Sequence, residues 1–169
     1  MKFSQKVAAT LLAVTSFSLV LSPIAIAQGE DTVDATVTFQ NVSLSVADGV
    51  VAYGTLGASS TSGTVALSDT QTVTNTGNVN EDFTIRGTNS LGWTLAGTAG
   101  ANAYVHRFCT ATCGTPPTNY TALTTSPATL ATNAAPAATP TFDLHITAPT
   151  SSTSFTQQEV DVVVQASAT

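Results

Sequence analysis

Apolar and polar residues alternate along residues 32–47, and the parity of this alternation changes once. Apolar residues stand at odd positions in the first half and at even positions in the second half: Val33, Ala35, Val37, Phe39, then Val42, Leu44 and Val46. Side chains of a strand alternate between two faces, so the change sends the apolar face to the other side. Two interpretations stay open. Either a β-bulge near Gln40 restores the face, or an arm that serves a neighbouring copy meets the first strand of its own domain here.

The rest of the chain shows short runs of β-branched and aromatic residues separated by turn residues, and no convincing amphipathic helix. The runs expected to form strands are residues 49–56, 64–67, 70–74, 82–86, 92–95, 102–108, 119–123, 141–147 and 158–168. Strands at such short spacing are typical of a sandwich of two sheets. The pattern therefore predicts an all-β fold, an Ig-like or jelly-roll-like antiparallel β-sandwich of about eight to ten strands.

The chain begins with the three parts of a secretory signal peptide. Two lysines precede an apolar run of leucine, valine and alanine, and Ala25-Ile26-Ala27 supplies the small residues of a cleavage site. We expect cleavage after Ala27. The predicted organisation is a signal peptide over residues 1–27, an N-terminal strand or arm over 28–40, and a β-sandwich domain over 41–169.

Loss of the leader leaves a strongly acidic chain. Both lysines go with it, and two arginines remain against ten acidic residues, a net charge of −8. Such a chain repels nucleic acid and anionic membranes, so neither is an expected partner. Threonine is frequent, and this residue favours the pleated surface of a sheet over a helix.

Two cysteines, Cys109 and Cys113, stand four residues apart. An exported protein meets oxidising conditions, which favours a disulfide between them. An extended strand would separate the pair by about 13 Å, so a disulfide requires a tight turn here. The alternatives are free thiols, or a zinc site in which His106 and His145 add ligands; the spacing is not a common zinc signature.

No residue pattern predicts catalysis, and the chain is not expected to be an enzyme or to hold a cofactor or a metal. No glycine-flanked nucleophile elbow appears in the chain, and no motif sets His106 or His145 beside a nucleophile. His145 falls on the outward face of an alternating strand, which predicts a solvated side chain. Trp93 is the only tryptophan. It is expected to anchor the core, with contact to a ligand as the alternative.

The leader, the strand with Tyr53-Gly-Thr-Leu56 and the turn Thr74-Asn-Thr-Gly-Asn78 resemble the TasA/camelysin type of secreted fibre proteins. In that family the mature N-terminus adds itself as a strand to a neighbouring subunit and so builds filaments. The resemblance implies that Val33, Ala35, Val37 and Phe39 contact another subunit.

Residues Gly92-Trp-Thr-Leu95 resemble the tryptophan motif of WxL-type cell-wall-binding domains. That family carries a second tryptophan motif near its end, where this chain has Val160-Asp-Val-Val-Val164. This second resemblance implies contact between Trp93 and a wall component.

Two functions are therefore expected from the sequence. The first is a secreted structural protein of the cell surface, a subunit of an extracellular filament or matrix that assembles with copies of itself through its N-terminal strand. The alternative is a monomeric adhesion or cell-wall and glycan-binding module that contacts cell-surface components.

Overall fold

The computed structural model describes residues 29–169, so the predicted leader, residues 1–27, lies outside the described part. The chain divides at Val37 into two compact units, and Thr38–Thr169 is the folded domain. Residues 29–43 contain no strand. Ten strands and one short helix follow within the described chain: β1 Leu44–Ala47, β2 Thr61–Gly63, α1 Thr64–Leu67, β3 Gln71–Asn75, β4 Glu81–Gly87, β5 Thr94–Leu95, β6 Ala103–Cys109, β7 Thr121–Ala122, β8 Ala128–Ala134, β9 Thr141–Thr147 and β10 Val162–Ala168.

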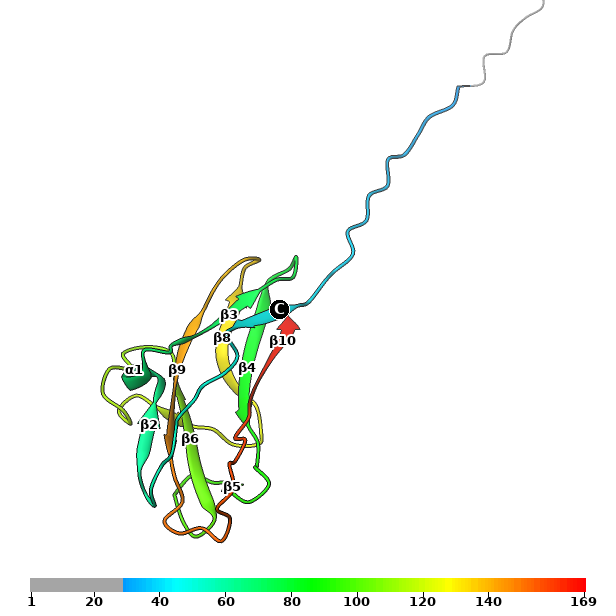
Figure 1. The fold of residues 1–169 in the computed structure, drawn as a ribbon. Coiled ribbons are helices and arrows are strands. Elements are labelled where there is room, and N and C mark those ends of the chain that lie inside the picture. The colour runs from blue at the N-terminus through cyan, green and yellow to red at the C-terminus, as the bar shows by residue number, and fades with distance from the viewer. Residues whose placement is uncertain (1–28) are drawn as a thin grey trace, which may run out of the picture. The chain divides into compact units, whose positions relative to one another are not determined.

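The strands form two sheets that pack together, so the predicted all-β sandwich is confirmed (Figure 1). The larger sheet has the order β1-β3-β9-β6-β5, with β2 paired to β9 and β7 paired to β6. The smaller sheet has the order β10-β4-β8. All pairings are antiparallel except that of β5 with β6.

The core lies between β4 of the smaller sheet and β3, β6 and β9 of the larger one. Burial alternates along the whole of β4, and its inward side chains Phe83 and Ile85 are fully buried. Phe142, Leu144 and Ile146 of β9 are buried as the sequence predicts. Alternation in the sequence thus identified the two strands that face each other across the core.

Two runs expected to form strands do not do so. Residues 64–67 form α1 instead. The Thr64 side chain bonds to the backbone of β9 at the position where a neighbouring strand would otherwise pair. Its hydroxyl oxygen accepts a hydrogen bond from the Leu144 backbone N–H at 2.9 Å and donates one to Asp143 at 2.8 Å. Residues 49–56 also contain no strand: the chain leaves β1 at Ala47, and residues 50–56 make no backbone–backbone hydrogen bond.

Residues 158–161 are likewise not part of a strand, since β10 begins at Val162. The predicted strand at 119–123 shrinks to the two residues of β7.

The change of parity at residues 40–41 is a junction and not a bulge. A bulge needs paired strand on both sides, and the described residues before β1 have no strand partner. The Asn78 side chain holds the junction: its amide nitrogen donates to the Phe39 carbonyl oxygen, and its oxygen accepts from the Asn41 N–H, both at 2.8 Å. The contacts of the chain with the β-sandwich therefore begin where the parity of the apolar positions changes.

Phe83→Ala should lower the free energy of unfolding by about 3–5 kcal/mol, because it removes a fully buried ring from the core. Phe155→Ala removes the same ring from a side chain that is 92% exposed and should change this free energy by less than about 0.5 kcal/mol. Urea denaturation followed by circular dichroism measures both. Equal effects of the two variants would contradict the assigned core.

Candidate functional site

The N-terminal arm, residues 29–40 of the described chain, presents an unpaired row of apolar side chains. Val33, Val37 and Phe39 are 93%, 96% and 86% exposed, and Ala35 is exposed as well. Single exposed apolar residues are ordinary on a protein surface, but four on one face of an alternating segment are not. The four residues predicted to contact a subunit are therefore available for such contact.

A large groove opens in the folded domain between two stretches of chain that belong to no strand. One bank is the segment 49–58, between β1 and β2, and the other is the segment 154–161, which leads into β10. The groove has a volume of about 1210 Å³. Its apolar lining comes from both sheets and both banks: Val46, Val51, Tyr53, Leu56, Phe142, Leu144, Ile146, Val160, Val162 and Val164.

Backbone groups on both banks lack backbone partners among the described residues. Residues 50–56 take part in no backbone–backbone hydrogen bond, and neither do residues 155–160. Strand β10 pairs with β4 on one side only, and its other edge is free of described strands. The residues of both banks are half-buried or exposed, so their backbone groups and the free edge of β10 are accessible to another strand.

Tyr53 holds its bank over the floor of the groove through a buried histidine. The Tyr53 hydroxyl lies 2.7 Å from Nε2 of His106, which is 1% exposed. Burial lowers the pKa of His106 to about 3, with a smaller contribution from the charge of His145. Burial also raises the pKa of Tyr53 above its usual range, with a smaller contribution from Asp69. Both groups are therefore neutral near pH 7, and the Tyr53 O–H donates to Nε2.

This tautomer places the imidazole proton of His106 on Nδ1, a buried atom without a hydrogen-bond partner in the described structure. The ring packs edge-on against Tyr53 and tilted against Tyr104. The contacts of His106 with its aromatic neighbours thus position segment 49–58. Sequence reasoning did not single out Tyr53 for any role, although its place in an alternating run was a usable signal.

The alternation of β9 predicted that the His145 side chain is solvated, and this prediction is wrong. The His145 side chain points to the outer face of the sheet but is only 7% exposed, because Tyr120 packs edge-on against it with ring centroids 5.8 Å apart. Burial lowers its pKa, and the Arg107 charge adds to the shift. The loop before β7 covers this face, which the alternation along one strand could not indicate.

Cys109 and Cys113 form a disulfide with their Cα atoms 5.7 Å apart, which confirms the predicted pairing and tight turn. The zinc alternative is wrong for these thiols, since they bond to each other. Within residues 29–169, no group of three histidine, cysteine or acidic side chains is placed to hold a metal. The bridge closes a loop at the end of β6 and lies outside the lining of the groove.

Trp93 lines the groove and is half-buried. Its indole N–H donates to the Ser152 hydroxyl at 2.9 Å, and its ring lies tilted against Tyr104 with centroids 6.2 Å apart. Trp93 is thus neither a fully buried core anchor nor a flat exposed platform, and ligand contact at this residue stays a prediction.

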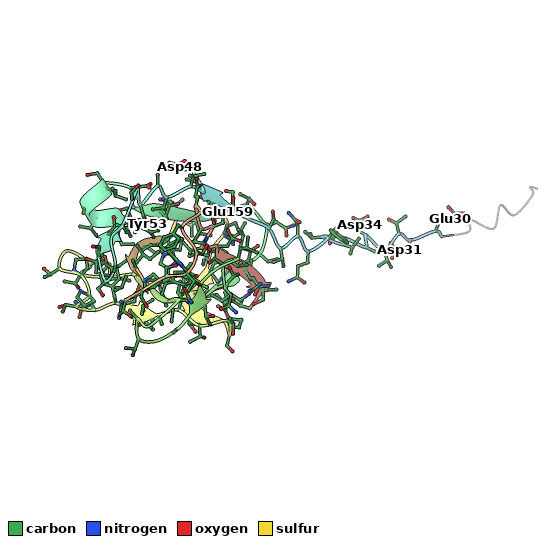
Figure 2. All side chains as sticks on the ribbon, turned by 60° about the horizontal axis from the view of Figure 1, so that its bottom comes forward. Glu30, Asp31, Asp34, Asp48, Tyr53 and Glu159 are labelled. Atoms are coloured by element: carbon green, nitrogen blue, oxygen red, sulfur yellow. A yellow bond between two sulfur atoms is a disulfide. The ribbon has the colours of Figure 1, made fainter. Side chains whose placement is uncertain are left out.

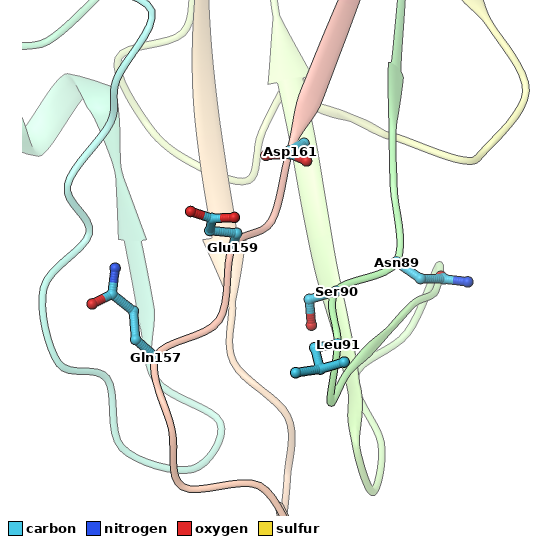
Figure 3. Close-up of a pocket in the computed structure, with 6 residues that line it drawn as sticks. All are labelled: Asn89, Ser90, Leu91, Gln157, Glu159 and Asp161. Carbon is cyan, nitrogen blue, oxygen red and sulfur yellow. The ribbon is translucent and has the colours of Figure 1, made fainter.

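Acidic residues on the segment 154–161 line both the groove and a second, smaller pocket. Figure 3 shows Glu159 and Asp161 on the segment before β10, next to a shallow polar pocket of about 420 Å³. Asn89, Ser90 and Leu91 form its other side. The arm is acidic too, as the labelled carboxylates of Glu30, Asp31 and Asp34 show in Figure 2. The described chain contains only Arg86 and Arg107 as permanent cations, and neither lines the groove.

No protein-family model, curated protein or solved structure matches this chain. The described part contains no helix that is long and apolar enough to cross a membrane. The resemblance to secreted fibre proteins therefore stays a prediction, and the arguments below rest on the residues themselves.

The free energy of unfolding should fall as the pH drops from about 6.5 toward 3. In this window an unfolded chain protonates the imidazole of His106, while the native one stays neutral. One such proton gives a slope of about 1.4 kcal/mol per pH unit, and His145 adds in the same direction. Urea titrations from pH 4 to 6.5 measure the slope. His106→Gln should reduce it; an unchanged slope in this variant would contradict the neutral buried histidine.

Proposed function

We propose that this protein is a secreted structural protein, a subunit of an extracellular filament or matrix that assembles from copies of itself. Assembly proceeds by strand addition, in which the N-terminal arm of one copy pairs with another copy. The observation that carries the proposal is the exposed row Val33, Ala35, Val37 and Phe39 on one face of an extended segment. Peptide segments of this kind gain affinity from main-chain pairing and specificity from alternate side chains.

The free energy that the arm can contribute suits a reversible, concentration-dependent assembly. Burial of the four apolar side chains contributes about 5–8 kcal/mol before the cost of ordering the arm. Main-chain hydrogen bonds add register and further stability. The donor surface differs from any acceptor surface, so the contact is heterologous, and repetition of a heterologous contact gives an open chain.

Two further features support an extracellular structural role. The disulfide between Cys109 and Cys113 is typical of an oxidising compartment. The chain is poor in charged residues but rich in threonine, which suits a protein built from sheets rather than one that binds polyanions.

The alternative function, a monomeric adhesion or wall-binding module, makes a different prediction for the purified protein. Such a module stays monomeric at every concentration and binds glycan or cell-wall material in a way that Trp93→Ala abolishes. Trp93 is only half-buried, so this test is open. A stable monomer with Trp93-dependent binding would replace the structural proposal.

Val37→Asp should abolish assembly, whereas Thr36→Asp should leave it nearly intact. Both positions are exposed in the described chain, so neither change disturbs the fold of a single copy. Only a paired strand distinguishes them, because Val37 then faces the partner and Thr36 faces solvent. Electron microscopy and analytical ultracentrifugation measure the result. Equal loss of assembly in the two variants, or none in either, would contradict strand addition.

Assembly should accelerate when salt is raised from about 10 to 100 mM, because this shortens the screening length from about 30 to 10 Å. Each copy carries ten acidic residues against two arginines, so approaching copies repel each other. Light scattering against sodium chloride concentration measures the rate. A rate that falls as salt rises would show that attraction between opposite charges drives assembly instead.

A further inference from the structure

Strand β10 has a long and regular edge without a partner among the described strands (Figure 1). It pairs with β4 over seven residues without a register shift, and it contains no charged residue and no proline. The other terminal strands of the two sheets differ: β8 shows register shifts against β4, β1 has four residues and β5 has two. Bulges, charges, prolines and short length are the features that protect free edges from pairing. Strand β10 has none of them.

The backbone hydrogen bonds at the two ends of β10 show which of its groups point away from β4. The Thr88 N–H donates to the Asp161 carbonyl oxygen at 3.1 Å, and the Thr169 N–H donates to the Asn80 carbonyl oxygen at 3.2 Å. Hydrogen-bonded and non-hydrogen-bonded residues alternate along an antiparallel pair, so the odd-numbered residues of β10 bond to β4. The N–H and C=O groups that point to the free edge belong to Val162, Val164, Ala166 and Ala168.

We propose that the free edge of β10 pairs antiparallel with the same edge of a second copy of this chain, about a two-fold axis at Gln165. The pairing joins the smaller sheets of the two copies into one continuous sheet. Each edge is consumed by its own counterpart, so this contact closes as a dimer. The inference goes beyond the proposed function, because no residue of the N-terminal arm takes part in the contact.

The free edge of β10 is complementary to itself in this register. Val162 lies opposite Ala168 and Val164 lies opposite Ala166, so groups that point to the free edge meet groups that do the same. These pairs exchange about eight hydrogen bonds in total, since each hydrogen-bonded pair exchanges two. Each valine also meets an alanine of the other copy, so larger side chains alternate with smaller ones along the joined edge.

The distribution of charge favours a second copy at this edge. The described chain carries ten acidic residues against two arginines, so most faces of two copies repel each other. Residues 162–168 carry no charge. The antiparallel register places Asp161 opposite Thr169, so no carboxylate of β10 or its ends lies opposite another carboxylate. Two acidic copies can therefore approach along β10 without placing like charges in contact.

The pairing leaves the N-terminal arms clear of the contact. The Ser43 N–H donates to Oε1 of Glu81 at 2.8 Å, and Glu81 pairs with Ala168, so the chain after the arm passes beside the C-terminal end of β10. Antiparallel pairing places the two C-terminal ends of β10 at opposite ends of the joined edge. A dimer formed in this way keeps two donor segments, and under the proposed function it can join two neighbours.

Charge reversal at the two-fold axis tests the proposal. Gln165 is exposed and forms the central, non-hydrogen-bonded pair, in which the two Cα atoms lie about 4.5 Å apart. The Val37→Asp protein removes the proposed arm contact and should still form a dimer. Adding Gln165→Asp or Gln165→Lys to it should raise the dimer dissociation constant at least about tenfold, because like charges then lie opposite each other. An equimolar mixture of the two should restore the dimer, as measured by sedimentation equilibrium.

The matched controls are Thr129→Asp and Thr129→Lys, which place the same charges at an exposed position of β8, the opposite edge of the smaller sheet. They should leave the dimer unchanged. A Val37→Asp protein that is monomeric at every concentration overturns the inference, and so does a dimer that charges at Gln165 do not weaken or that the mixture does not restore. Dimers of the unaltered protein that never extend into filaments contradict the proposed function and leave this inference standing.

A cysteine at the axis gives a second measurement that does not depend on charge. Two Cα atoms about 4.5 Å apart lie within the range that a disulfide bridges. Oxidised Gln165→Cys protein should therefore form a covalent adduct of two chains at about tenfold or more the yield of Thr129→Cys, because only the first position meets its own copy. Equal yields from the two variants overturn the assignment of β10 as the contact.

Discussion

The requirement that backbone N–H and C=O groups find partners organises this molecule more than any single side-chain contact. At several places where the backbone hydrogen bonds between two strands end inside the domain, a polar side chain bonds to the remaining backbone groups. Asn75, which is 1% exposed, donates to the Val79 and Ala134 carbonyl oxygens at 2.8 and 2.9 Å. Thr64 does the same for β9, and Asn78 for the start of the domain. Residues 50–56, on one bank of the groove, make no backbone–backbone hydrogen bond within the described chain.

This difference connects the fold to the proposed assembly. A sandwich whose open edge were closed by its own side chains would have no reason to recruit a strand, and a free, flat edge is a recognised site of strand addition. Tyr53 and His106 keep one bank over the floor of the groove without backbone pairing, so the space stays bounded and apolar. The arm and the segment 154–161 both carry acidic residues, so the proposed assembly should depend on the salt concentration.

Several elements could be predicted from the sequence because one strand's own alternation carries the signal. Phe83 and Ile85 of β4, and Phe142, Leu144 and Ile146 of β9, are buried as their period of two indicates. The disulfide followed from the spacing of two cysteines and the expected export. The prediction of a strand over residues 49–56 was wrong. Alternation shows which side chains are apolar, but it does not show whether a neighbouring backbone is present to pair with this segment.

The sequence by itself determined the all-β class, the inward faces of β4 and β9, the disulfide and the alternation of the arm, since these depend on residues close together in the chain. Only the tertiary structure decided that Thr64 ends a ladder, that Tyr120 buries His145, and that segments 49–58 and 154–161 face each other across a groove. Those outcomes depend on backbone and side chains that are distant in sequence. The spacing of apolar residues within one segment gives no information about the residues that a distant segment will place beside it.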